Sequence, residues 1–175
     1  MKKRFYKSAA AIAMFVMAGS AMAESTTSAL TVSATVNNAC SIGAATMNFG
    51  NLTASLSGGN ARVAPVNVDA TTSVAVICTL GAVAKVGGNS GLHNVAAVRK
   101  MASGTDLLVY DLYAVAAHTT VLDEVVAAAG TIAYTGTGAT GDTVTIYGRI
   151  LAADVLSAKK GAYSDTVTLS IFYTL

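Results

Sequence analysis

Short runs of alternating apolar and polar residues recur along the chain, and turn-forming residues separate them. Alternation with a period of two places one set of side chains on each face of an extended strand. Small residues dominate the composition, with 16 Gly and one Pro. The pattern predicts an all-β sandwich with a core of small side chains. The expected strands are Cys40–Ile42, Arg62–Val68, Val74–Thr79, Ala82–Val86, Val95–Met101, Leu107–Val115, Thr131–Thr135, Thr143–Ile150 and Ser164–Leu175.

Three of these runs carry further information. In Val74–Thr79 both alternating sets are apolar or nearly so, which predicts a central strand of a packed sheet. Arg62–Val68 contains Pro65, which cannot donate to a ladder, so this strand is expected at an edge or a bulge. In the third run, Leu108, Tyr110 and Leu112 are expected to share one face. Asp123–Ala129 is expected to form about one helical turn.

The run Ser28–Val36 alternates like a strand but has no obvious partner within the chain. Chain ends are normally frayed unless something ties them down. We therefore expect a neighbouring subunit to pair with this segment. The side chains that would share its apolar face are Leu30, Val32, Ala34 and Val36.

The last run also has an unbroken apolar face. It consists of Val167, Leu169, Ile171 and Tyr173, whereas Thr166, Thr168 and Ser170 lie opposite with Phe172. The pattern predicts that one side of this strand faces a core. An ordinary final strand of a sandwich would show the same pattern.

The first 23 residues resemble a targeting segment. A basic start precedes an apolar run over Ala9–Ala18 and the tripeptide Ala21-Met22-Ala23. This order is typical of a secretory signal peptide. The apolar run is shorter than the roughly 20 residues that span a bilayer, so no membrane span is expected. We expect a signal peptide at residues 1–23, an N-terminal extension at 24–37 and one β-sandwich domain at 38–175.

Charge and cysteine content narrow the function further. Four of the 11 Lys and Arg residues lie in the expected leader, so the remainder carries about two more acidic than basic residues. No basic surface for nucleic acid is therefore expected. Cys40 and Cys78 are the only two cysteines. In an exported protein such a pair indicates a disulfide, and a redox-active pair would favour Cys-x-x-Cys spacing.

Motifs with possible chemistry are weak. Gly136–Gly141 matches Gly-x-Gly-x-x-Gly, but a strand-like run follows it, so we interpret it as a flexible hairpin connection and not a nucleotide site. His93 and His118 lack neighbouring ligand residues and are interpreted as loop or surface residues. The pair Asp123-Glu124 is interpreted as a solvated turn. No cofactor, metal site or enzymatic activity is expected.

Several stretches together resemble the spore-coat-protein-U-like domain, the family that includes subunits of Csu-type, or archaic, chaperone-usher pili. They occur in family order across nearly the whole expected mature chain. The stretches are Cys40-Ser41-Ile42, Asn48-Phe49-Gly50, Val76-Ile77-Cys78-Thr79, the run from Leu108 to Tyr113, the run from Ile146 to Ile150, and the run from Gly161 to Leu169.

The resemblance implies an incomplete immunoglobulin-like sandwich that is completed by donor-strand exchange. In that family a periplasmic chaperone first fills the groove beside the C-terminal strand. At the outer-membrane usher, the N-terminal extension of the next subunit then replaces the chaperone. By resemblance, Leu30, Val32, Ala34 and Val36 are donor residues. By the same resemblance, the expected acceptor groove and chaperone contacts are Val167, Leu169, Ile171, Tyr173 and the terminal carboxylate of Leu175.

The expected function is a non-enzymatic subunit, the major rod subunit, of a surface pilus that polymerises with itself and serves attachment and biofilm formation. Such a protein would be secreted through the periplasm to the cell surface. Two alternatives stay open: a minor or adaptor pilin, and a monomeric spore-coat or envelope protein of the same fold.

Overall fold

The computed structural model describes residues 24–53, 55–56, 62–63, 66–124 and 131–174. The chain divides into two parts, Met1–Thr35 and Val36–Leu175. In the first part, the described residues 24–35 form neither helix nor strand, and all of them are exposed. All helices and strands of the described residues lie in the second part.

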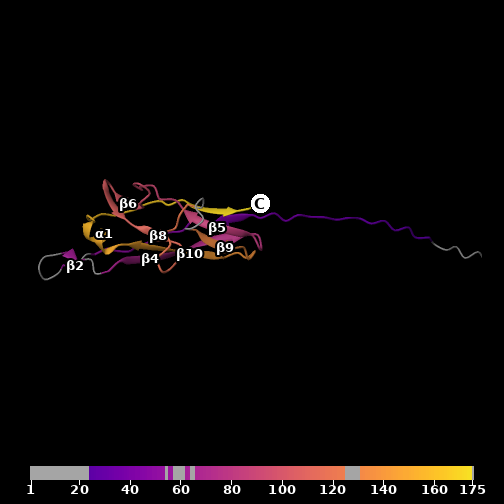
Figure 1. Ribbon diagram of the computed structural model, residues 1–175, viewed down its shortest axis with the longest axis horizontal. Helices are drawn as coiled ribbons and strands as arrows, with labels where there is room; N and C mark the ends of the chain where they lie inside the picture. The colour runs from indigo at the N-terminus through magenta and orange to yellow at the C-terminus, as the bar shows by residue number, and fades with distance from the viewer. Residues whose placement is uncertain (1–23, 54, 57–61, 64–65, 125–130, 175) are drawn as a thin grey trace, which may run out of the picture. The chain divides into compact units, whose positions relative to one another are not determined.

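The regular secondary structure of the second part consists almost entirely of strands (Figure 1). One sheet has the strand order β1-β4-β10-β8 and another has the order β11-β5-β9, while β2 pairs with β3 and β6 pairs with β7. The bounds are β1 Cys40–Ile42, β2 Ser55–Leu56, β3 Arg62–Val63, β4 Val68–Cys78, β5 Val83–Gly88, β6 Lys100–Ser103, β7 Asp106–Val109, β8 Asp111–Tyr113, β9 Ile132–Thr135, β10 Thr143–Ile150, α1 Ala152–Ser157 and β11 Leu169–Tyr173.

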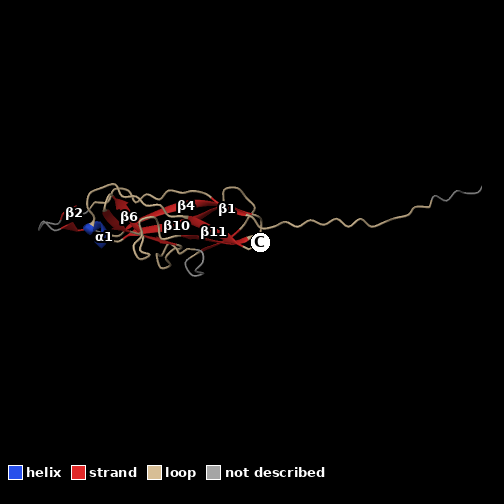
Figure 2. Ribbon diagram, turned by 90° about the horizontal axis from the view of Figure 1, so that it is seen from above, coloured by secondary structure: helices blue, strands red, loops and turns tan. Residues whose placement is uncertain are grey.

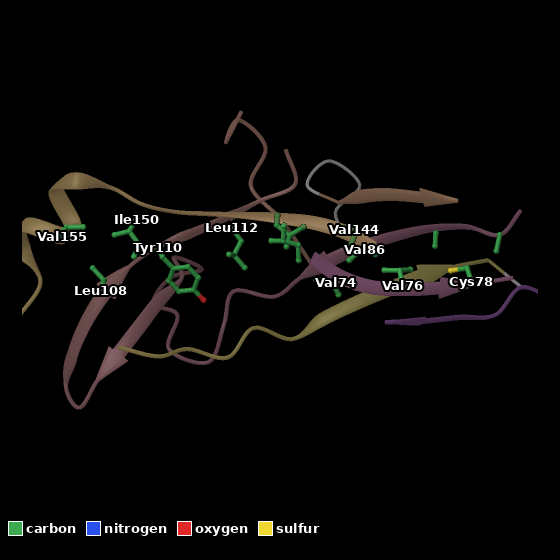
Figure 3. Close-up of a cluster of buried hydrophobic side chains, with 14 residues drawn as sticks. Val74, Val76, Cys78, Val86, Leu108, Tyr110, Leu112, Val144, Ile150 and Val155 are labelled. Atoms are coloured by element: carbon green, nitrogen blue, oxygen red, sulfur yellow. The ribbon is translucent and has the colours of Figure 1, made fainter. Parts of the chain in front are cut away.

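A single cluster of buried side chains joins the two larger sheets. It includes Val76 of β4, Ile146 of β10 and Val86 of β5, each of which is at most 2% exposed. Figure 3 shows the cluster as a row that runs from Val155 at one end to Cys78 at the other. The predicted all-β sandwich is confirmed. Its buried side chains are mostly Val, Ala, Leu and Ile, so the prediction of a core of small side chains is confirmed only in part.

The longest ladder of the fold pairs β4 with β10 over eight residues of each, from Thr143 opposite Ala75 to Ile150 opposite Val68. β1 pairs with the other end of β4, so β4 is a central strand, as predicted. Only one face of β4 is covered, however. Val74, Val76 and Cys78 are buried, whereas Ile77 on the opposite face is 42% exposed. The apolar character of the second face therefore did not indicate burial.

Two local predictions are wrong, one of a hairpin connection and one of a strand. Gly136–Gly141 does not close a hairpin, because β9 and β10, which flank it, belong to different sheets. The residues at the start of Val95–Met101 are not a strand: Val95 and Val98 exchange backbone hydrogen bonds across a tight turn. Ala96 and Ala97 have φ angles of 52° and 63°. Strand β6 begins only at Lys100, after this turn.

The one helix of the described residues, α1, was not predicted. It has six residues, too few to show a helical period, and only Val155 of it is buried. Figures 1 and 2 place α1 at the end of the sandwich opposite the C-terminal end of β11. Of the helical turn expected at Asp123–Ala129, the first two residues are exposed and not helical, and residues 125–130 lie outside the described residues. No helix among the described residues is long and apolar enough to cross a bilayer.

Candidate functional site

The C-terminal strand is hydrogen-bonded along one edge only. β11 is the terminal strand of its sheet and pairs with β5. Before β11, the even-numbered residues continue the same bonded edge: Asn89 N donates to Thr168 O, Leu92 N to Thr166 O, and Ala102 N to Ser164 O, at 2.9–3.0 Å. Successive residues of a strand direct their peptide groups to opposite edges. The peptide groups of Asp165, Val167 and the odd-numbered residues after them therefore point to the other edge, where no strand lies among the described residues.

A groove runs along this free edge. One wall consists of residues 45–49, and the other consists of the segment that leads into β11, from Tyr163 to Leu169. The floor includes Tyr110 and Leu112, and the cavity measures about 320 Å³. A second cavity of about 610 Å³ shares Met47 and Phe49 with the first and extends toward α1. Together, the two cavities extend from Leu169 to Val155 of α1 and are lined by both apolar and polar residues.

The predicted acceptor residues differ in their positions. Val167 and Leu169 line the smaller cavity, and both are half-buried. Ile171 is half-buried on β11 but lines neither cavity, and Tyr173 is 36% exposed at the end of β11. Leu175 lies outside the described residues. The groove is therefore formed beside the first half of the predicted apolar face.

A contact near the disulfide explains why the second half of that face is not open. Asn38 Nδ2 donates a hydrogen bond of 2.6 Å to Thr174 O, just past the end of β11. β1 and β11 also approach each other, with Cα atoms within 8 Å. A strand between two others needs about 9.6 Å, twice the usual spacing of neighbouring strands. The groove is thus closed at this end and open toward α1.

The opposite wall was missed by the sequence analysis. Met47 and Phe49 are both half-buried and line both cavities. A Cβ atom added to Gly148 of β10 would meet Met47 Sδ at 2.3 Å and Phe49 Cζ at 2.8 Å. Glycine at this position therefore allows the wall to pack directly on the sheet. The alternation of Met47 and Phe49 was a signal that could have indicated this wall.

The predicted donor residues lie on exposed backbone. Leu30, Val32 and Val36 are 87%, 83% and 82% exposed, and Ala34 is exposed as well. Isolated exposed aliphatic side chains are common on soluble proteins, but three large ones at strand spacing form a continuous apolar edge. This segment has no strand assignment.

The predicted disulfide is present. Cys40 and Cys78 face each other in the ladder between β1 and β4, with Cα atoms 4.1 Å apart. Cys78 is 3% exposed and belongs to the core cluster. The bond fixes β1 against the central strand of its sheet.

A buried polar network lies behind the wall that carries the free edge. The side chain of Asp165 is 2% exposed. Its Oδ1 accepts hydrogen bonds from Leu92 N at 3.0 Å and His93 N at 3.1 Å and lies 3.0 Å from His93 Nδ1, while Oδ2 accepts one from the Tyr110 hydroxyl at 2.6 Å. Burial raises the pKa of this carboxyl, but the hydrogen bonds that it accepts lower it more, so the net pKa lies below the usual range. Burial and the bond to Asp165 raise the pKa of Tyr110.

Arg99 stabilises the same region. It is 4% exposed and donates to the carbonyl oxygens of Gly88, Asn89 and Leu122. Burial lowers its pKa. A buried guanidinium that donates to backbone carbonyls satisfies groups that would otherwise be unpaired at the end of β5.

The two histidines are less exposed than predicted. Both lie in loops, but His93 is half-buried beside Asp165. The side chain of His118 is 9% exposed and packs edge-on against Tyr113 and Tyr147, with ring centroids 5.0 and 6.2 Å away. The interpretation as loop or surface residues is therefore confirmed for the loop position, but the side chain of His118 is not exposed at the surface. Among the described residues, no group of three or more His, Cys, Asp or Glu side chains could hold a metal ion.

Comparison with known proteins agrees with this arrangement. The Spore Coat Protein U domain matches residues 26–170, and the chain belongs to this family. The resemblance seen in the sequence is thereby confirmed.

Among solved structures, the chain is similar to one in the crystal structure of the CsuC–CsuE chaperone–tip adhesion subunit pre-assembly complex from archaic chaperone-usher Csu pili of Acinetobacter baumannii. The identity is 22% and the TM-score is 0.49, over 78% of this chain and 40% of that chain. This chain therefore matches less than half of the length of that one. No curated protein matches the chain significantly.

Proposed function

We propose that the protein is a structural subunit of a chaperone-usher pilus and polymerises by donor-strand exchange. The observation that carries the proposal is the groove between Ala45–Phe49 and Tyr163–Leu169, which lies beside the free edge of the C-terminal strand. Exposed strand edges promote association, and addition of a strand satisfies their peptide groups. Membership of the Spore Coat Protein U domain family supports this assignment.

The donor in this proposal is the extension of the next subunit. Leu30, Val32, Ala34 and Val36 would point into the groove, because side chains two residues apart share a face. Burial of one Leu and two Val side chains stabilises by about 1.5–3 kcal/mol each, and ladder hydrogen bonds add about 1 kcal/mol each. The sum is on the order of 10 kcal/mol before ordering costs. A junction of that strength suits a durable filament.

The acceptor residues are Val167, Leu169, Ile171 and Tyr173. Full insertion along all four requires the closed end of the groove to open, so the hydrogen bond from Asn38 to Thr174 must break. A periplasmic chaperone would hold the groove open before assembly and bind the carboxylate of Leu175. The outer-membrane usher would then exchange the chaperone for the next subunit. The complete pilus lies on the cell surface.

The proposal assigns the protein no catalytic role and takes it as the repeating rod subunit, which serves attachment and biofilm formation. A minor or adaptor pilin would use the same groove and the same extension. A monomeric envelope protein of this family would instead pair its extension within its own sandwich.

Self-complementation tests the proposal. A second copy of Ala29–Asn37, attached after Leu175 through a flexible turn, should fill the chain's own groove. The extended chain, without residues 1–23, is expected to be a stable monomer by size-exclusion chromatography, whereas the unextended chain should polymerise or aggregate. A matched control carries Val32→Asp in the attached copy and should behave like the unextended chain. An unextended chain that is an equally stable monomer would contradict the proposal.

A further inference from the structure

Asp165 joins three parts of the molecule that meet at the groove. Its carboxylate accepts hydrogen bonds from the backbone of Leu92 and His93, which form the loop behind the wall. It also accepts a bond from the hydroxyl of Tyr110, which lies on the floor. Asp165 itself belongs to the wall and lines the cavity. One buried side chain thus connects wall, floor and supporting loop.

The loop is shaped to close on this carboxylate. Gly91 has a φ angle of 84°, and a Cβ atom placed there would lie 2.0 Å from Asp165 Oδ2. Only glycine suits both the backbone conformation and the space. Asn89 attaches the loop a second time, since its Oδ1 accepts bonds from Gly91 N at 3.0 Å and from Thr168 N at 2.9 Å. The loop and the wall therefore form one hydrogen-bonded unit.

The position of Asp165 along the strand connects this unit to the free edge. Its neighbours Ser164 and Thr166 are bonded to Ala102 and Leu92 on the supported edge. The peptide groups of Asp165 itself therefore point to the free edge. Asp165 therefore combines two features. Its side chain is fixed behind the wall, and its peptide groups are among those that an incoming strand would meet.

We propose that Asp165 is a positioning residue for strand addition. It fixes the free edge of the C-terminal strand relative to the groove floor, so that an added strand lies close enough to pair with that edge. This inference rests on the proposed function. Neighbouring strands pair at about 4.8 Å, so a displaced edge loses ladder bonds. Without the carboxylate, the Tyr110 hydroxyl and two backbone N–H groups also lose a charged acceptor in a buried place.

Peptide binding measures the effect. The protein is the chain from residue 24 with Val32→Asp, so that its own extension does not compete for the groove. The probe is a fluorescent peptide of residues Ala29–Asn37, and anisotropy gives its Kd. Asp165→Asn is expected to raise the Kd about tenfold, as for loss of a charged hydrogen bond. Asp69→Asn is the matched control, because it removes a carboxylate that pairs with Arg149 away from the groove, and it should leave the Kd unchanged.

Peptides with Leu30→Ala or Val36→Ala separate positioning from a general loss of stability. These two residues lie at opposite ends of the donor face, so only one of them can bind beside Asp165. In a double-mutant cycle, Asp165→Asn should couple with one of the two substitutions and be additive with the other. Additivity with both, or an unchanged Kd, would overturn the positioning role.

Tyr110→Phe keeps the inference testable if Asp165→Asn does not fold. It removes a single hydroxyl from the network and should raise the Kd about threefold, with coupling to the same peptide residue. An unchanged Kd in this variant would also overturn the inference. If the unsubstituted groove fails to bind the peptide at all, the proposed function is wrong, and the positioning role falls with it.

Discussion

β4 and the C-terminal strand carry the same kind of apolar face, but the structure covers them differently. Val74, Val76 and Cys78 on β4 are at most 3% exposed, whereas Val167, Leu169 and Ile171 are only half-buried. β4 is paired on both edges, by β1 and β10, and the C-terminal strand is paired on one. Alternation in a sequence therefore indicates which face is apolar, but it does not show that the chain itself supplies the cover.

The same contrast holds for the walls of the groove. β1, the strand that precedes the wall of residues 45–49, is fixed to β4 by a disulfide, whereas the wall that leads into β11 is held by hydrogen bonds, both between backbone groups and through the side chains of Asp165 and Asn89. One wall thus follows a strand that is covalently fixed, and the other is held by hydrogen bonds. This division suits a groove whose closed end must open when a strand is added.

The largest expected effect comes from a charge on the donor. Val32→Asp should abolish polymerisation but leave the isolated subunit folded, because Val32 is 83% exposed in the subunit. In a neighbour's groove the carboxylate would be buried against apolar walls, which costs several kcal/mol or forces protonation. Co-expression with the cognate chaperone, followed by separate measurement of complex yield and surface pili, gives the two readouts.

Ser33→Asp is the control, because it places the same charge on the opposite face of the donor. It should retain most of the pili. Loss of the chaperone complex in Val32→Asp would place this strand in the subunit's own core, and normal pili would remove it from the junction.

The disulfide should give the next largest effect. Replacing both Cys40 and Cys78 with Ala opens a loop with a sequence separation of 38 residues, which lowers the free energy of unfolding by about 4 kcal/mol in the chain-entropy model. The measurement is denaturant unfolding of the self-complemented monomer. A loss well below 1 kcal/mol would show that β1 is held mainly by its ladder and that the two walls are less different than we infer.

A pair of Val→Ala substitutions compares the two strands directly. Val76→Ala on β4 should lower the stability of the isolated subunit by about 2 kcal/mol, because it removes buried methyl groups and leaves a cavity. Val167→Ala should cost the isolated subunit less than about 1 kcal/mol but weaken donor-peptide binding about tenfold. Equal losses of subunit stability in the two variants would contradict the claim that the C-terminal strand awaits its cover.

The sequence allowed prediction of the fold class and of the disulfide, and the alternation of Leu108, Tyr110 and Leu112 correctly indicated a buried face. Strand β10 has the predicted bounds. These features depend on local periodicity and on the number of cysteines, which a sequence carries directly. The sheet to which a strand belongs does not depend on local periodicity. The Gly-rich run before β10 resembled a hairpin, although its flanking strands lie in different sheets.

The candidate site was predictable only in part. Val167 and Leu169 were identified from their alternation, and they line the groove. The opposite wall and the network around Asp165 were missed, because Gly91, Tyr110 and Asp165 are far apart in the sequence and meet only through the tertiary fold. The closed end of the groove also depends on one side-chain contact, from Asn38 to Thr174, that no local pattern indicates.

The smallest expected effect is a pH dependence of the hydrogen-bonded wall that leads into β11. The hydrogen bonds that Asp165 accepts outweigh its burial and hold its pKa below the unfolded value of about 3.9. A depressed carboxyl pKa contributes stability that is fully present above the unfolded pKa and is lost as the pH falls through the folded pKa. This contribution should therefore begin to fade as the pH falls below about 4.

Asp111 on β8 provides the opposite case, because burial raises its pKa and its protonation therefore favours the folded state as the pH falls. Denaturant unfolding of the self-complemented monomer between about pH 6 and pH 2.5 compares the two carboxyls. Asp165→Asn should lower stability near neutral pH and make the acid loss shallower than in the wild-type chain, whereas Asp111→Asn should make it steeper. If Asp165→Asn loses stability in acid as steeply as the wild-type chain, the carboxylate does not hold the wall through its charge. The wall that leads into β11 would then be held by Asn89 and by backbone hydrogen bonds.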